Sequence, residues 1–174
     1  MVSKLKISQA GTADISTISK IQKKAWLATY PNLGTGVTRA DILKKDFTGL
    51  EPTRYQNMAD DNWRYFLAQK DNQTIGYAAA KKEADQGIIK LVHVLPQFQN
   101  QGVGSVLLEQ VLKWLVGKRI VLQVVRANFG TIAFYQKFGF SPIGPGRPIK
   151  VAGKEIATLK MVIPNTWQYY KSVL

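Results

Sequence analysis

The sequence has no cysteine and only one histidine, His93. Without cysteine the chain has no means of forming a disulfide, a thiolate metal site or a cysteine nucleophile. A single histidine supplies too few ligands for a zinc site, so we expect no bound metal. A chain of 174 residues is nevertheless long enough to bury a stable apolar core.

Long apolar segments are also missing. The chain nowhere approaches the roughly 18 consecutive apolar residues of a membrane-spanning helix, and its charged start does not lead into one. No repeat, low-complexity tract or long linker divides the sequence. We therefore expect a single cytoplasmic domain over residues 1–174, without a membrane partner.

Acidic residues are few, with 11 Asp and Glu against 24 Lys and Arg and a net charge of +13. The imbalance is largest in residues 110–174, where ten basic residues accompany one acid, Glu155. Residues 38–61 are the exception, with four basic and five acidic residues. A solvated basic surface explains this charge, and so does a nucleic acid or an anionic cofactor bound by the C-terminal half.

Hydrophobic periodicity indicates helices near the N-terminus. After a short strand, a helix that Thr12 or Asp14 can cap is expected, followed by a loop over residues 28–36. A short second helix is expected to face inward with both Ile42 and Leu43.

Strand patterns follow, and their order predicts a mixed sheet. An antiparallel meander is expected over residues 63–69, 74–82 and 87–95, with a turn at Asp71 and Asn72. The remaining pattern predicts a helix over 103–116, a strand over 119–125, a helix over 129–138, and strands over 140–143 and 156–163. Strand, helix and strand in succession imply a parallel crossover. We expect an α/β fold whose mixed, mostly antiparallel sheet has helices on both faces.

Two glycines stand between a strand and an amphipathic helix in LPQFQNQGVGSVLLEQVLKWL. A helix start presents unsatisfied backbone N–H groups and a partial positive charge, and Gly102 and Gly104 let a phosphate come close. A tight strand-to-helix turn alone would also explain the pair. The loop has no Gly-Lys-Ser/Thr, and Leu107 stands where a dinucleotide fingerprint has its third glycine, so ATP and NAD are disfavoured.

Two segments resemble motifs of the GNAT superfamily of N-acetyltransferases. Gln99-x-x-Gly102-x-Gly104 is similar to the family's acyl-CoA-binding pattern, Arg/Gln-x-x-Gly-x-Gly/Ala. Residues 128–140, NFGTIAFYQKFGF, resemble the later segment in which an Asn precedes a helix that carries a Tyr and ends in Gly-Phe. The resemblance implies an acyl-CoA N-acyltransferase fold with splayed central strands. It also implies transfer of an acetyl group from acetyl-CoA to a primary amine of a small molecule or protein, by direct attack in a ternary complex.

The resemblance also places the cosubstrate. It implies that the pantetheine arm lies between the strands ending near Val94 and Val125, with the backbone of Val92 and Val94 pairing with its amides. The pyrophosphate would be wrapped by Gln99, Asn100, Gln101, Gly102, Val103, Gly104 and Ser105. Asn128 would contact the pantetheine, unless it only caps the next helix, and Lys137 would reach a phosphate, unless it faces solvent.

Tyr135 is, by resemblance, the proton donor to the departing thiolate, although it fits an ordinary core aromatic as well. Some family members carry a glutamate base on the strand before the glycine loop, but QGIIKLVHVL contains no acid. His93 is a second catalytic candidate, as the general base, because histidine titrates in a suitable range. The alternative is that His93 is only packed in the strand and that the amine is deprotonated through water.

The acceptor is not identified by the sequence. By resemblance it would enter beside the loop over residues 28–36 and the short helices after it. Trp26 and Tyr30 are expected either to line this entrance or to belong to the core. Acids such as Asp60 and Asp61 would suit a cationic amine, and polyamines, protein N-termini, lysines and aminoglycosides all stay open.

The rival hypothesis is a non-enzymatic, basic RNA-binding or ribosome-associated module with a GNAT-like fold. Stacking of bases needs aromatic residues placed between basic residues on a strand. In this sequence Phe129, Phe134, Tyr135 and Phe138 instead follow a helix pattern, which makes nucleic-acid binding the weaker hypothesis. A monomer and a homodimer are both compatible with the sequence.

Overall fold

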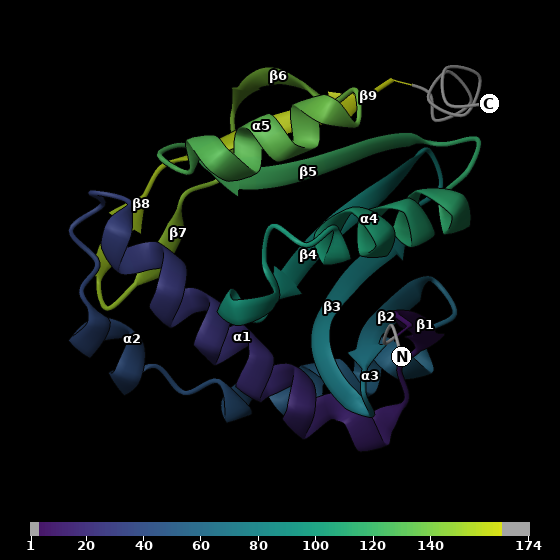
Figure 1. Cartoon of the computed structure of the whole chain (residues 1–174). Helices are drawn as coiled ribbons and strands as arrows, with labels where there is room; N and C mark the ends of the chain where they lie inside the picture. Colours follow the sequence, from purple (N-terminus) through teal and green to yellow (C-terminus); the bar gives the residue numbers. More distant parts are fainter. Residues whose placement is uncertain (1–3, 165–174) are drawn as a thin grey trace.

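A seven-stranded sheet forms the centre of the computed structural model, which describes residues 4–164 (Figure 1). The strand order is β1-β2-β3-β4-β5-β9-β6, and β7 and β8 form a separate hairpin. The strands are β1 (Lys6–Gln9), β2 (Trp63–Lys70), β3 (Gln73–Lys82), β4 (Gln86–Val94), β5 (Arg119–Val125), β6 (Ser141–Pro145), β7 (Ile149–Val151), β8 (Lys154–Ile156) and β9 (Thr158–Ile163).

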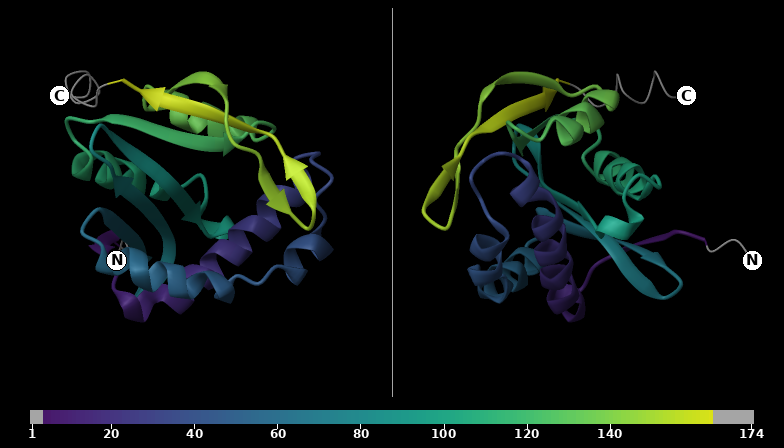
Figure 2. Two further views of the ribbon diagram at one scale, coloured as in Figure 1. Left: turned by 180° about the vertical axis from the view of Figure 1, so that it is seen from behind. Right: turned by 60° about the vertical axis from the view of Figure 1, so that its left-hand side comes forward.

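Helices cover both faces of the sheet, as predicted (Figure 2). The first face is covered by α1 (Ile15–Thr29) and α3 (Glu51–Ala59), which contact β3 and β2, with α2 (Arg39–Lys44) beside α1. The other carries α4 (Val103–Trp114), which contacts β2, β3 and β4, and α5 (Phe129–Lys137). The short 3-10 helices are η1 (Thr12–Asp14), η2 (Tyr30–Asn32), η3 (Thr48–Leu50) and η4 (Pro96–Phe98). Within residues 4–164 no helix has the length and apolar character needed to cross a membrane.

Strand β3 is buried on both faces because its side chains alternate between two cores. Ala78 and Ala80 pack with the α4 side, whereas Tyr77 and Ala79 pack with the α1 side. Helix α4 contributes a fully buried apolar stripe, made of Leu107, Leu108, Val111 and Leu112, to the first of these cores. Each buried Leu contributes about 1.5–3 kcal/mol, so this stripe fixes α4 firmly against the meander.

The parallel strands β4 and β5 pair over only part of their length. The pairs run from Gln86 with Arg119 to Ile89 with Leu122 and stop there. Next to Ile89, a register shift against β3 leaves Lys90 unmatched, and such a bulge bends and twists its strand. Beyond it the two strands diverge, while β5 continues to pair with β9 through Val125. The expected crossover and splayed central strands are confirmed.

A third apolar cluster joins the N-terminal helices to the C-terminal part of the chain. It consists of Val37, Ile42, Phe47, Val125, Val151 and Ile156. The β7–β8 hairpin was not expected, and the strand predicted over 156–163 is interrupted at Ala157, where the chain passes from the hairpin into β9. The inward orientation predicted for Leu43 is wrong, because a helix of six residues buries only Ile42 and leaves Leu43 50% exposed.

Candidate functional site

The splay leaves the second half of β4 without a strand partner on its β5 side. Val92 and Val94 pack their side chains against the α4 core. Leu95 donates its N–H to the Ile75 carbonyl on the β3 side, so by alternation the peptide groups of Val94 and Val92 point to the open edge. Peptide groups at such an edge need hydrogen-bond partners, and an extended molecule with amides can supply them. The Val94 carbonyl is already used in part, since it accepts a hydrogen bond from Gln99 Nε2 at 3.0 Å.

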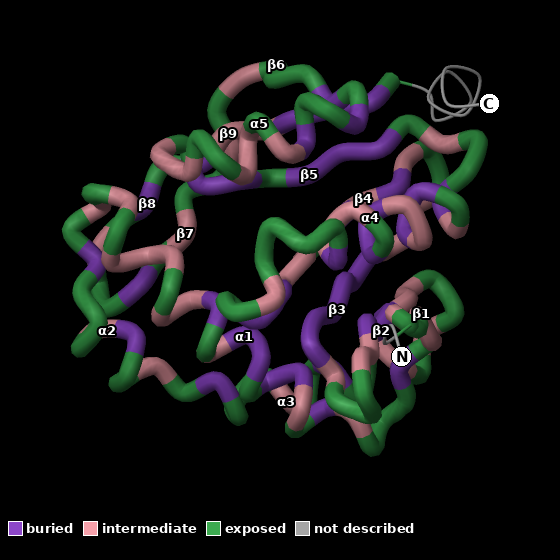
Figure 3. The backbone as a smooth tube through the Cα atoms, in the orientation of Figure 1, coloured by how far each residue is buried: buried purple, intermediate pink, exposed green. Residues whose placement is uncertain are grey.

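The loop between η4 and α4 lies next to this edge and is exposed over residues 99–102 (Figure 3). Asn100 and Gly102 both have left-handed backbones, with φ of 59° and 80°. Gly102 is the N-cap of α4 and provides no side-chain acceptor for the first N–H groups of the helix, on Val103 to Ser105. Gly104 lies between β4 and α5, because a Cβ there would be 3.7 Å from Phe134 and 3.9 Å from Val94. Uncapped helical N–H groups in an exposed loop are well suited to an anion.

Helix α5 carries the other predicted residues. Asn128 is its N-cap, and its Oδ1 accepts the N–H of Thr131 at 3.1 Å, so only its Nδ2 is left to donate to a ligand. Lys137 lies in the last turn and is exposed. At a rise of about 1.5 Å per residue, it is roughly 13 Å along the helix from Asn128.

Tyr135 is buried with its ring against Phe134 and Phe140, at centroid distances of 5.2 and 5.6 Å. Its hydroxyl makes no hydrogen bond to any residue in the described part of the chain. Burial raises the pKa of this phenol above its usual value, so the proton stays on the oxygen at neutral pH. A protonated, unengaged phenol can act as a proton donor.

His93 faces the opposite side, toward α1, and is half-buried beside a buried polar cluster. Arg54, which is only 4% exposed, donates to Ser19 Oγ at 2.7 Å and to Gln22 Oε1. His93 Nε2 and Tyr77 Oη are enclosed without a partner among residues 4–164. Burial, and then the charge of Arg54, lower the pKa of His93 to about 4. This setting favours a packed, neutral histidine over a general base.

Trp26 and Tyr30 stack on each other at 4.4 Å, and Phe47 packs edge-on against Trp26 at 5.4 Å. The rings of Trp26 and Tyr30 pack against the third apolar cluster and thereby support the loop that follows α1. Burial raises the pKa of Tyr30 to about 12. Asp60 and Asp61 precede β2, whose start pairs with the end of β3, so they lie away from the splayed end.

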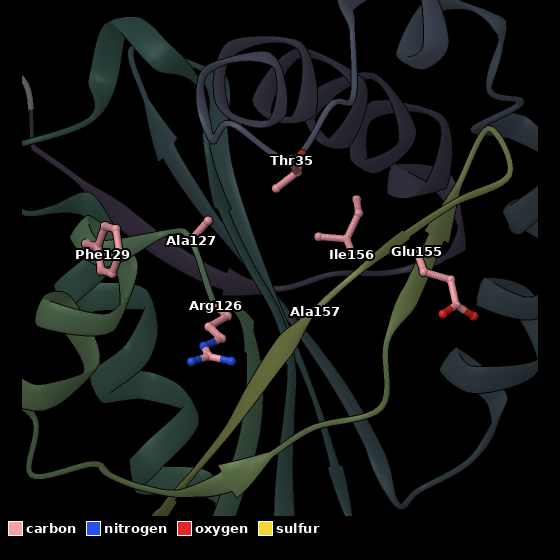
Figure 4. Close-up of a pocket in the computed structure, with 7 residues that line it drawn as sticks. All are labelled: Thr35, Arg126, Ala127, Phe129, Glu155, Ile156 and Ala157. Carbon is pink, nitrogen blue, oxygen red and sulfur yellow. The ribbon is translucent and has the colours of Figure 1, made fainter.

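A pocket of about 470 Å³ opens at the splayed end of the sheet (Figure 4). Its walls come from the loop after α1, the β5–α5 junction and the β8–β9 junction. It is lined by Thr35, Arg126, Ala127, Phe129, Glu155, Ile156 and Ala157. Thr35 lies in the loop over residues 28–36, beside which the acceptor was expected to enter. Sequence reasoning missed the other lining residues as site residues, because segments so far apart give no periodic signal. The one available cue was that Arg126 and Phe129 flank Asn128, a residue already singled out.

Lys154 fastens the β7–β8 hairpin to the segment that carries Thr35. Its Nζ lies 2.7 Å from Asp41 Oδ2 and donates to the Gly36 carbonyl at 2.6 Å. Asp41 also caps α2 by accepting the backbone N–H of Thr38 at 2.8 Å. The hydrogen bonds from Lys154 and then Thr38 hold the pKa of Asp41 well below its usual range, so the pair is charged at neutral pH. Hairpin and loop therefore form one continuous wall of the pocket.

A comparison with protein families identifies one family. A model described as Acetyltransferase (GNAT) family matches residues 37–140. The PaiA N-acetyltransferase of Thermoplasma acidophilum, in complex with coenzyme A, has a TM-score of 0.73 and 17% identity over 90% of this chain and 98% of that one. The ribosomal-protein-S18-alanine N-acetyltransferase of Escherichia coli has a TM-score of 0.70 and 21% identity, over 92% and 94%.

A spermidine N-acetyltransferase chimera from Vibrio cholerae and hSSAT has a TM-score of 0.73 and 17% identity, over 97% of this chain and 99% of that chain. At such identities the structural likeness establishes the fold alone. A comparison with curated proteins finds no match.

Proposed function

Because the chain belongs to the GNAT acetyltransferase family, we propose that it transfers an acetyl group from acetyl-CoA to a primary amine by direct attack in a ternary complex. The observation that carries this proposal is the position of the unpaired β4 edge beside the uncapped start of α4. Acetyl-CoA has amides in its pantetheine arm and phosphates next to that arm, and the two features complement these groups in the same order.

The cosubstrate is held mainly by backbone groups in this proposal. The edge at Val92 and Val94 pairs with the pantetheine amides, and Asn128 donates to them through its free Nδ2. The pyrophosphate lies in the loop of residues 99–105, where favourable interactions with a helix start are worth roughly 0.3–2 kcal/mol. Lys137 contacts a phosphate in this proposal only if the cosubstrate extends along α5.

The chemistry follows from groups near the splay. The lone pair of the neutral amine attacks the thioester carbonyl carbon, the C–S bond breaks, and the thiolate takes the phenol proton of Tyr135. The amine then loses a proton to water, because β4 has no acid and His93 Nε2 is enclosed. Tyr135 is restored by proton exchange with solvent after the products leave.

The acceptor enters through the pocket between the β7–β8 hairpin and the β5–α5 junction. Trp26 and Tyr30 act indirectly, by supporting the loop that lines it. We propose that residues 1–174 act as one N-acetyltransferase domain in the cytoplasm, without bound RNA or membrane. Size-exclusion chromatography with light scattering decides between a monomer and a homodimer.

Cosubstrate binding is tested by thermal shift and calorimetric titration with acetyl-CoA, NAD, ATP and a short RNA. Only acetyl-CoA is expected to stabilise the fold, because a ligand of the native state raises apparent stability by mass action. Stabilisation by RNA alone would support the rival binding module instead.

A matched pair of glycine variants locates the phosphate site. Gly102 and Gly139 have φ of 80° and 83°, and a Cβ at either would meet no atom within 4 Å. Gly102→Ala and Gly139→Ala therefore share a backbone cost of about 1–2 kcal/mol. Only Gly102→Ala should weaken acetyl-CoA binding, and equal affinities in the two variants would exclude the loop as the phosphate site.

A further inference from the structure

We propose that the acceptor amine carries a second, oxyanionic group, such as a carboxylate or phosphate, which Arg126 binds at the rim of the pocket. This inference rests on the proposed function and names the substrate class of the same site. It excludes polyamines, whose charges are all positive, as the preferred acceptors.

The position of Arg126 is fixed by the sheet. Its backbone N–H donates to the carbonyl of Ala157 at 2.9 Å, so the residue stands where β5 ends and β9 begins. The side chain lines the pocket and is exposed. Over residues 4–164, no carboxylate lies within ion-pair distance of its guanidinium. A guanidinium has a planar fork of donors that matches an oxyanion, so this one is free to bind a ligand.

The one acid that lines the pocket does not offset this charge. Glu155 points away from Arg126 (Figure 4), and its Oε1 lies 3.6 Å from Lys150 Nζ. The acidic residues Asp60 and Asp61 lie away from the splayed end. A cationic tail would therefore meet a positive rim with no free carboxylate to receive it.

The remaining lining residues suit the rest of such a molecule. Ala127, Ile156 and Ala157 form a small apolar wall, and Phe129 presents a ring that is 77% exposed. A large exposed aromatic beside an unpaired arginine is typical of a surface that a partly apolar, charged ligand covers. The pocket therefore fits an amine with a short apolar body and an anionic end.

The positive rim also assists the reaction in the absence of a protein base. A cation near an amine disfavours its ammonium form and lowers its pKa. An acceptor anchored through Arg126 would therefore present more of the neutral amine that attacks the thioester. Charge at the rim thus contributes to both selectivity and activation.

Matched substrates test the proposal. Thiol release is measured with phenylalanine and phenylalaninamide, with phosphoethanolamine and ethanolamine, and with spermidine. The oxyanionic member of at least one pair is expected to have the higher kcat/KM, although the amide's amine is the less basic and chemically the easier acceptor. Preference for the member without the oxyanion in both pairs, or for spermidine, overturns the proposal, as does a lack of turnover with both oxyanionic amines.

Variants of Arg126 separate this inference from the proposed function. Arg126→Gln should raise KM for the preferred oxyanionic amine by about tenfold or more, since hydrogen bonds to charged groups are individually strong. Kd for acetyl-CoA and the KM of the partner amine that lacks the oxyanion should not change. Arg147→Gln, which removes an exposed guanidinium outside the pocket lining, is the matched control.

Two further outcomes of the Arg126 experiment are decisive. If Arg126→Gln weakens acetyl-CoA binding as much as acceptor binding, Arg126 contacts the cosubstrate and the inference fails. If wild-type protein does not bind acetyl-CoA in the calorimetric titration, the proposed function fails first, and this inference falls with it.

Discussion

At the scale of single residues, the Tyr135 hydroxyl has no structural role that the described contacts reveal. Tyr135→Phe keeps the ring contacts with Phe134 and Phe140 and removes only the proton. We expect kcat to fall by roughly 10²- to 10⁴-fold, the usual contribution of a positioned acid, with Kd for acetyl-CoA unchanged. Steady-state kinetics measure kcat, and calorimetry measures Kd for acetyl-CoA. Full turnover by the variant would mean that Tyr135 is only a core aromatic.

Tyr77 provides the matched phenol on the other face of the sheet. Its hydroxyl is fully buried near Arg54, but within the described range it makes no hydrogen bond of good geometry. A buried group left unsatisfied in this way costs about 1–3 kcal/mol. Tyr77→Phe should therefore raise the free energy of unfolding by about 1 kcal/mol and leave kcat unchanged. Denaturant unfolding measures the first quantity, and a loss of stability would mean that the hydroxyl has a partner in solution.

The single histidine gives the protein a pH dependence with a defined sign. The pKa of His93 is lowered from 6.5 to about 4 in the folded state, so the unfolded chain binds its proton first as the pH falls. Stability is fully retained above the unfolded pKa and declines as the pH falls toward 4, by up to about 1.4 kcal/mol per pH unit. Between about pH 7 and about pH 5, wild type should lose roughly 2 kcal/mol, and His93→Phe should lose much less. Parallel slopes for the two proteins would contradict the shift.

At the scale of elements, the β7–β8 hairpin offers two lysines in contrasting settings. Lys154 is fixed between Asp41 and the Gly36 carbonyl, whereas Lys150 lies 3.6 Å from Glu155 with both side chains largely exposed. Lys154→Met should raise the acceptor KM several-fold and speed hydrogen exchange in the hairpin, because exposed pairs contribute little and anchored ones more. Lys150→Met should leave hydrogen exchange in the hairpin unchanged. Equal exchange rates in the two variants would show that apolar contacts alone hold the hairpin.

Elements with strong local signals were predictable from the sequence. The turn at Asp71 and Asn72 joins β2 to β3, where both residues adopt positive φ, and the α4 stripe follows helical spacing. The β7–β8 hairpin was missed because each of its strands has three residues, too short for a periodic pattern. Arg54 was missed because nothing in a short, polar helix reveals that its guanidinium is buried by residues of α1.

At the scale of the whole molecule, the net charge of +13 should govern how fast the anionic cosubstrate arrives. Raising the salt from about 0.1 M to about 1 M shortens the screening length from roughly 10 Å to roughly 3 Å. The association rate constant of acetyl-CoA should therefore fall steeply in stopped-flow experiments, while its dissociation rate changes less. Acetyl-pantetheine, which lacks the phosphates, is the control, and an equal salt dependence for both molecules would rule out electrostatic steering.

The cosubstrate side of the site was more predictable than the acceptor side because its residues lie closer together in the sequence. The residues proposed for acetyl-CoA lie mainly in contiguous segments around β4, α4 and α5, so local motifs describe them. The pocket instead joins Thr35, Arg126 and Ile156, which meet only through tertiary packing. No local rule relates such residues, and the structure was needed to bring them together.

The third apolar cluster affects how the protein folds during its synthesis on the ribosome. Val37, Ile42 and Phe47 are made well before Val151 and Ile156, which complete their cluster. The chain leaves the ribosome from its N-terminus at roughly 5–20 residues per second, so the α2 region waits exposed for several seconds. By then β4, α4, β5 and α5 have already been synthesised. The pocket that we propose for the acceptor is therefore completed only after the elements proposed to bind the cosubstrate have been made.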